Sequence, residues 1–148
     1  LISPDGYASP GMEYGKKTEV PAIAELYRYF FSKTFLAMNL EPAYANPKTL
    51  NDDLVNRYYD LMLAPGVRGA ILARMQQTVL KDPVPSLANI QVPTLLIWGE
   101  KDAFIPISNS NDYLKVMPNV KRVSLPNIGH LPQEEQPTIG LAALKEFL

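Results

Sequence analysis

Residues 92–106 read VPTLLIWGEKDAFIP, an apolar run that ends in a glycine and is followed by a polar loop. The apolar part, residues 92–99, does not alternate apolar with polar side chains, a pattern typical of a strand buried on both faces. Such strands occur in parallel sheets that are covered by helices on both sides. The run therefore predicts a strand buried on both faces of a parallel sheet, with a loop at its carboxyl end.

The residues after this run continue an α/β pattern. The apolar spacing predicts a helix over 107–117, a second strand over 120–125 and a final helix over 137–148. A strand, a helix and a further strand within about 55 residues form a βαβ unit, which implies parallel pairing and a right-handed crossover. The predicted fold class is α/β.

Two loops follow the two predicted strands, and each carries a residue suited to proton transfer. Asp102 follows the first strand and His130 follows the second. Neighbouring strands lie about 4.8 Å apart, and the carboxyl ends of parallel strands meet at one edge of the sheet. A carboxylate that accepts a hydrogen bond from one imidazole nitrogen fixes the tautomer and supports the protonated ring. The pair would therefore be a general base ready to activate a nucleophile.

These two loops resemble those of the α/β-hydrolase fold superfamily. Residues 93–102, PTLLIWGEKD, are similar to its seventh strand and acid loop, and residues 129–137, GHLPQEEQP, to its histidine loop. The Glu135-x-Pro137 pattern before the last helix also resembles the family. The resemblance implies that Asp102 is the acid of a catalytic triad and that His130 is the general base.

The resemblance also implies a division of the chain, namely the C-terminal part of an α/β-hydrolase parallel sheet with an inserted all-helical cap. Leu1-Ile2 would be the end of a core strand. The expected segments are 1–12 (strand end and loop), 13–85 (helical cap) and 86–148 (α/β core with the acid and histidine loops). Proline and glycine predict a loop over 4–20, and apolar spacing predicts helices over 21–38, 50–63 and 67–80. Thr49 would cap the second of these helices and Ser86 a short turn over 86–90.

The sequence departs from the family at the nucleophile. The family's chain order is nucleophile, acid, histidine, and its serine nucleophile lies in a Gly-x-Ser-x-Gly turn. No such turn occurs in these 148 residues. We therefore expect the nucleophile upstream of Leu1, so that the chain is a fragment that is inactive alone. Its expected partners are a small-molecule substrate and either the missing N-terminal half or a second copy.

The resemblance implies a serine-type hydrolase that acts on a small, largely apolar substrate. An ester-like carbonyl is the first expectation, and hydrolysis of a C–C bond in an acidic diketone is the second. An aspartate nucleophile would instead give epoxide or haloalkane hydrolysis, because the same histidine then activates water. A relative that keeps the fold for binding alone is a further alternative.

Several other residues are candidates for the site. Asp5 is an alternative acid, although its Pro-Asp-Gly context is first of all that of a turn. Phe104 and Leu131 flank the expected catalytic pair and are candidates for the substrate pocket. Tyr27 and Phe31, in the predicted cap, are further pocket candidates, but aromatic residues at helical spacing more often form a core.

Composition limits the function classes. The chain has 14 Lys+Arg against 15 Asp+Glu and no basic stripe, which argues against a nucleic-acid surface. It has no cysteine and one histidine, so thiolate and histidine-rich metal sites are excluded, and no metal or cofactor is expected. No apolar stretch is long enough to span a membrane, and the lack of cysteine is compatible with the cytoplasm, the expected compartment.

Overall fold

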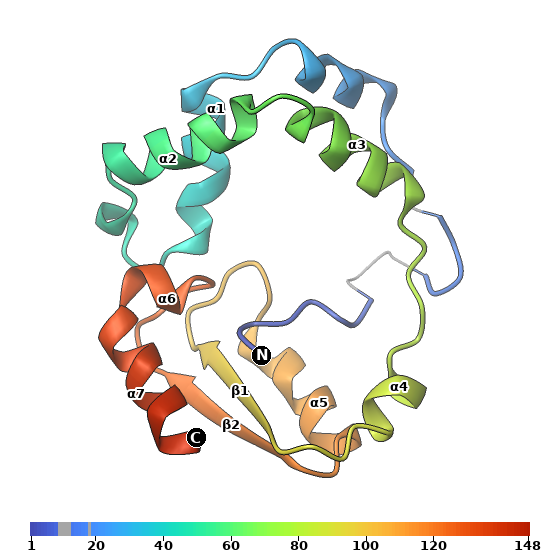
Figure 1. Cartoon of the computed structure of the whole chain (residues 1–148), viewed down its shortest axis with the longest axis vertical. Coiled ribbons are helices and arrows are strands. Elements are labelled where there is room, and N and C mark those ends of the chain that lie inside the picture. The colour runs from blue at the N-terminus through green and yellow to red at the C-terminus, as the bar shows by residue number, and fades with distance from the viewer. Residues whose placement is uncertain (9–12, 18) are drawn as a thin grey trace. The chain divides into compact units, whose positions relative to one another are not determined.

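A computed structural model describes residues 1–8, 13–17 and 19–148 of the chain (Figure 1). Residues 9–12 and 18, which fall within the loop predicted over 4–20, lie outside the described residues. The chain divides into two compact units. The core unit comprises Leu1–Tyr7, Leu40–Leu50 and Pro83–Leu148, and the helical unit comprises Ala8–Asn39 and Asn51–Asp82.

The core unit is built on two parallel strands, β1 (Thr94–Gly99) and β2 (Val120–Leu125). Their register places Thr94 opposite Val120 and Gly99 opposite Leu125, so both strands end at the same level. This confirms the predicted parallel pair. β1 begins two residues later than predicted, after Pro93, which has no backbone N–H to donate.

The first three residues of the chain lie along the other edge of β1. Ile2 forms a parallel bridge with Ile97, the Ile97 N–H donates to the Leu1 carbonyl at 2.9 Å, and the Ser3 N–H donates to the Ile97 carbonyl at 3.0 Å. Residues 1–3 therefore lie beside β1 as an extension of the sheet, where the end of a core strand is expected. β1 therefore has hydrogen-bonded neighbours along both of its edges.

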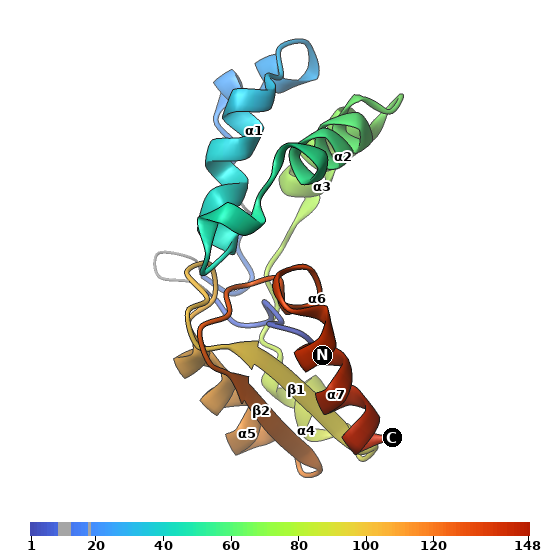
Figure 2. The ribbon, with the colours of Figure 1, turned by 90° about the vertical axis from the view of Figure 1, so that its left-hand side faces the viewer.

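Helices cover both faces of the sheet, with α7 on one side and α5 on the other (Figure 2). Leu95 and Ile97 belong to an apolar cluster that packs against α7 (Pro137–Phe147). Leu96 and Trp98, both 0% exposed, pack on the other face with residues that include Tyr113 of α5 (Ser110–Val116). These two layers explain why the strand has no polar face, and they confirm the predicted α/β class. The short helices of the core unit are η2 (Glu41–Ala43), η3 (Pro47–Thr49), α4 (Val84–Ala88), η4 (Ile107–Asn109) and α6 (Pro132–Glu135).

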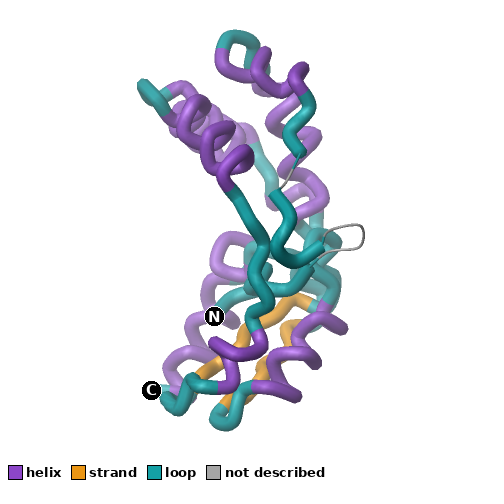
Figure 3. The backbone as a smooth tube through the Cα atoms, turned by 90° about the vertical axis from the view of Figure 1, so that its right-hand side faces the viewer, coloured by secondary structure: helices purple, strands orange, loops and turns teal. Residues whose placement is uncertain are grey.

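The helical unit differs from the prediction at its start. The single helix expected over 21–38 is wrong, because the structure has a 3-10 helix η1 (Ala22–Arg28) and then α1 (Lys33–Leu40) (Figure 3). Ser32 starts the second helix, since its hydroxyl accepts a hydrogen bond from the Phe35 N–H at 3.1 Å. The apolar spacing runs through this break, and a serine that caps a helix N-terminus overrides it.

The other helices of this unit are α2 (Asp52–Leu63) and α3 (Val67–Gln77). α2 is capped by Asn51, which accepts from the Leu54 N–H at 3.0 Å, and not by Thr49 as predicted. α3 ends before the predicted residue 80, because Val79 bridges Lys17 in an antiparallel pair. In the core unit, α4 begins before Ser86 and has no side-chain cap, so the cap expected from Ser86 is also wrong.

Replacement of Gly99 by alanine tests how tightly the end of β1 is packed. An added Cβ would fall onto the carbonyl oxygens of Ile128 and Gly129, which are backbone atoms that cannot rotate away. We expect Gly99→Ala to lower the free energy of unfolding by about 1–3 kcal/mol, as measured by urea denaturation. Gly140→Ala is the matched control, because that position in α7 has no atom within 4 Å of an added Cβ.

The control should be neutral or stabilising by up to about 1 kcal/mol, since alanine is the better helix former. Equal stability of Gly99→Ala and wild type would show that the backbone contact at Gly99 is loose.

Candidate active site

Asp102 is held by its own loop at the end of β1. Its Oδ1 accepts hydrogen bonds from the backbone N–H groups of Phe104, at 3.0 Å, and Ile105, at 2.8 Å. The Ile105 carbonyl in turn accepts from the indole Nε1 of the buried Trp98 at 2.9 Å. Asp102 therefore closes a tight turn that the sheet's core anchors, and its side chain is 0% exposed.

His130 lies on the loop after β2, directly beside the acid loop. The Lys101 N–H donates to the Ile128 carbonyl at 2.9 Å, which ties the two loops together. Gly99 makes this possible, because any side chain there would collide with the backbone of residues 128 and 129. The carboxyl ends of both strands therefore deliver their loops to one edge of the sheet.

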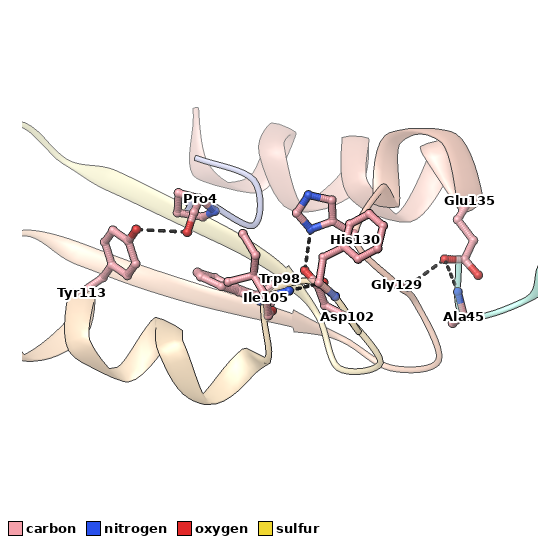
Figure 4. A network of polar contacts seen from close by, with 10 residues as sticks. Pro4, Ala45, Trp98, Asp102, Ile105, Tyr113, Gly129, His130 and Glu135 are labelled. Atoms are coloured by element: carbon pink, nitrogen blue, oxygen red, sulfur yellow. Dashed lines mark hydrogen bonds and ion pairs between the residues drawn. The ribbon is translucent and has the colours of Figure 1, made fainter. Parts of the chain in front are cut away.

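The two predicted residues meet in a direct hydrogen bond (Figure 4). Nδ1 of His130 lies 2.8 Å from Oδ2 of Asp102. The acid is buried, whereas the His130 side chain is 24% exposed. A carboxylate accepts only, so the neutral imidazole donates from Nδ1 and leaves Nε2 free to accept a proton. Such an arrangement can act as an oriented general base.

The environment of Asp102 favours its ionised form. Burial alone raises the pKa of this carboxyl, but the hydrogen bonds from His130 and from the Ile105 N–H outweigh it, so the pKa lies below its ordinary value. The buried Ser3 hydroxyl adds a smaller effect of the same sign, although its geometry falls short of a hydrogen bond. Asp102 is therefore a carboxylate at neutral pH, as an orienting acid requires.

The structure places the other candidates of the core unit as follows. The Phe104 ring lies 5.4 Å from the His130 ring and is 48% exposed, so it offers an apolar surface next to the histidine. Leu131 follows His130 in the chain and is half-buried. Asp5 is exposed, and the hydrogen bond to Nδ1 of His130 is made by Asp102.

Tyr27 and Phe31 lie in the helical unit, within an aromatic cluster. The Phe31 ring stacks on Tyr59 at 6.0 Å, and Tyr27 packs on Phe35 at 5.3 Å. Part of the cluster borders an open hollow of about 550 Å³, lined by Tyr27, Tyr29, Phe30, Phe31, Ser32 and Phe35. Tyr27 and Phe31 thus pack against other aromatic rings of the helical unit and also line an apolar hollow on it.

Glu135 is a residue of the site that the sequence did not single out for a role. It is 8% exposed, and its carboxylate accepts hydrogen bonds from the backbone N–H groups of Gly129 and Ala45 (Figure 4). It also accepts one from the Asn46 N–H. The available signal was an acidic residue five positions after His130, in the Glu-x-Pro pattern. Nothing in that signal points to residues 45–46, which lie 89–90 positions away.

No group of three or more potential ligand residues gathers to hold a metal ion within residues 1–8, 13–17 and 19–148. In the same part of the chain no helix is both long and apolar enough to cross a membrane.

The chain belongs to the alpha/beta hydrolase fold family, whose pattern it matches over residues 21–137. It is 22% identical over its whole length to an uncharacterised hydrolase of Bacillus subtilis, YugF, of which it covers 55%. It is 30% identical over 67 residues to Lipase 1 of Psychrobacter immobilis, a match that covers 43% of this chain and 21% of the lipase.

A solved structure with the same fold is the meta-cleavage product hydrolase of Pseudomonas fluorescens, with a TM-score of 0.70 and 19% identity. The match covers 90% of this chain and 52% of that protein. Each of these two relatives, YugF and the meta-cleavage product hydrolase, matches most of this chain. The chain spans about half the length of each of them.

The depressed pKa of Asp102 predicts a loss of stability in acid. Because its folded-state pKa lies below the ordinary value of 3.8, the carboxylate stabilises the fold fully at higher pH and loses this contribution as the pH falls through the folded-state pKa. We expect the wild type to be more stable than Asp102→Asn at neutral pH, and the difference to shrink below about pH 4.

Urea denaturation of the two proteins at a series of pH values measures this difference. A difference that stays constant from neutral pH to below the folded-state pKa would contradict the pKa assignment.

Proposed function

We propose that Asp102 and His130 are the acid and the general base of a serine-type hydrolase. The observation that supports this most directly is the 2.8 Å contact between Nδ1 of His130 and Oδ2 of a fully buried carboxylate. The bond holds the imidazole in one orientation and leaves Nε2 as the accepting atom. A histidine with a purely structural role does not need an ionised acid and a partly exposed ring.

In the proposed reaction, Nε2 of His130 takes the proton of a serine hydroxyl as the serine oxygen bonds to the substrate carbonyl carbon. The carbonyl electron pair moves onto oxygen, and backbone N–H groups stabilise the resulting anion. When the tetrahedral intermediate collapses, the alcohol leaves with the proton from His130. A water molecule, deprotonated by the same nitrogen, then releases the acid and restores the serine.

The serine and the oxyanion hole belong, in this proposal, to a part of the protein outside these 148 residues. Two observations support it: the chain has no Gly-x-Ser-x-Gly turn, and it covers 55% of the relative that it matches over its whole length. The proposed partner of the core unit is therefore the other half of the same hydrolase.

The proposed substrate is a small, largely apolar ester. The exposed ring of Phe104 beside His130 supplies an apolar wall at the reacting position. The 67-residue similarity to Lipase 1 supports an ester over a C–C bonded carbonyl substrate. p-Nitrophenyl esters of short fatty acids are suitable first substrates for the intact protein.

Substitutions in the intact protein test the two roles. His130→Ala should lower kcat for p-nitrophenyl butyrate by about 10³-fold or more, because no other group takes the proton. Asp102→Asn should lower kcat by about 10³–10⁴-fold, since an amide does not hold the imidazole in the required tautomer. Asp5→Asn should leave kcat unchanged. The opposite ranking of the two aspartate variants would make Asp5 the acid.

A fluorophosphonate probe tests the nature of the nucleophile. The intact wild type should be labelled on a serine, and His130→Ala should be labelled far more slowly, because the probe needs an activated hydroxyl. Hydrolysis of an epoxide or a haloalkane, without labelling by the probe, would indicate an aspartate nucleophile. Neither labelling nor hydrolysis would favour a protein that keeps the fold for binding.

A further inference from the structure

We propose that Glu135 is a positioning residue that holds His130 in its catalytic place by binding the histidine loop to residues 43–46. The inference rests on the proposed function, because it concerns the same base. Glu135 lies at the end of α6 and is 8% exposed. Its carboxyl group is therefore buried, and the fold must provide hydrogen-bond donors for its oxygens.

The donors are three backbone N–H groups. One belongs to the histidine loop, and two belong to a segment far from it in the sequence. Oε2 of Glu135 accepts from Gly129 at 2.7 Å and from Ala45 at 3.2 Å, and Oε1 accepts from Asn46 at 2.7 Å. Hydrogen bonds to an ionised acceptor are about twice as strong as neutral ones. One side chain thus ties the histidine loop to a segment that lies about 90 positions earlier in the chain.

The tied segment returns a hydrogen bond to the histidine itself. The Ala43 carbonyl accepts from the His130 N–H at 2.7 Å. The N–H groups of two successive residues, Gly129 and His130, are therefore both fixed, one by Glu135 and one by the segment that Glu135 holds. This closed set of contacts determines where the Cα of His130 lies.

The two segments are in direct backbone contact, so the arrangement has little freedom. A Cβ on Gly129 would fall onto the Ala43 carbonyl oxygen and lie 2.7 Å from the Ala45 nitrogen. On its other side, the loop is held by the Lys101 N–H, which bonds the Ile128 carbonyl at 2.9 Å. Without Glu135 the loop would lose the hydrogen bond at the Gly129 N–H and its side-chain tie to the N–H groups of Ala45 and Asn46.

A small shift of the histidine loop is enough to break the hydrogen bond that orients the His130 ring. The bond between Nδ1 of His130 and Oδ2 of Asp102 is 2.8 Å long, and a displacement of about 1 Å would break it. Misplacement by about 1 Å can lower turnover by about 10²-fold. Because Glu135 is not placed in contact with the substrate, its loss should affect kcat and leave KM unchanged.

Glu135→Gln in the intact protein is the test. Glutamine has the same shape, but its NH2 group would face a backbone N–H group, and two donors cannot bond each other. The hydrogen bonds that one of the two carboxylate oxygens accepts are therefore lost. We expect kcat for p-nitrophenyl butyrate to fall by about 10–100-fold with KM unchanged. Glu134→Gln is the matched control on the same helix, because its amide oxygen still accepts from the Tyr44 hydroxyl, which Glu134 accepts at 2.6 Å.

Two measurements that do not depend on turnover accompany the kinetics. In Glu135→Gln, the Nδ1–H proton resonance of His130 should broaden or disappear, and the amides of Gly129 and His130 should exchange with deuterium at least about 10-fold faster. Amides of β1 should exchange as in wild type, which separates local release of the loop from unfolding. If the wild type hydrolyses no ester, the proposed function fails, and these two measurements still decide the role of Glu135.

Glu135→Asp gives an independent test if the glutamine variant does not fold. Aspartate keeps the carboxyl group but is one methylene shorter, so it can accept only some of the three backbone hydrogen bonds. We expect an intermediate loss of kcat, with weaker changes in the His130 resonance and in amide exchange. Wild-type kcat, resonance and exchange in both variants would overturn the proposal. The same would follow from equal effects of Glu134→Gln and Glu135→Gln.

Discussion

The backbone of the histidine loop lies directly against Gly99, and the rest of the site depends on this contact. The carbonyl groups of residues 128 and 129 occupy the space where a side chain at position 99 would stand. Because β1 and β2 are in parallel register and end together, the loops that leave them can meet only if one of them carries no side chain at the junction. The short distance between Asp102 and His130 follows from that packing.

Two buried carboxylates organise this edge of the core unit, and both are held by backbone N–H groups. Asp102 accepts from its own loop, which fixes it relative to β1. Glu135 accepts from two segments, which fixes the histidine loop relative to residues 43–46. Backbone donors are rigid because the peptide group is planar. Each acid therefore fixes the segments that it binds more firmly than an ion pair with a flexible lysine or arginine side chain would. His130 lies between these two fixed points.

The sequence predicts the parts of the structure that depend on local pattern and strand order. The pairing of Asp102 with His130 follows from two apolar strands that each end before a polar loop. The break at Ser32 was missed, because apolar spacing continues across it while one hydroxyl starts a new helix. The role of Glu135 was missed for another reason. Its partners are backbone groups, which leave no mark on residue type, and some lie about 90 positions away.

Trp98 is the only tryptophan in the 148 residues, and it is fully buried beneath the acid loop. Its indole N–H bonds the Ile105 carbonyl, and the N–H of that same residue bonds Asp102. The tryptophan fluorescence of this chain therefore comes from a single ring, which is bonded to the residue that anchors the Asp102 carboxylate. Opening of the acid loop would admit water to the indole and shift its emission to longer wavelength, so Trp98 is an optical reporter, within these 148 residues, of the state of the acid loop.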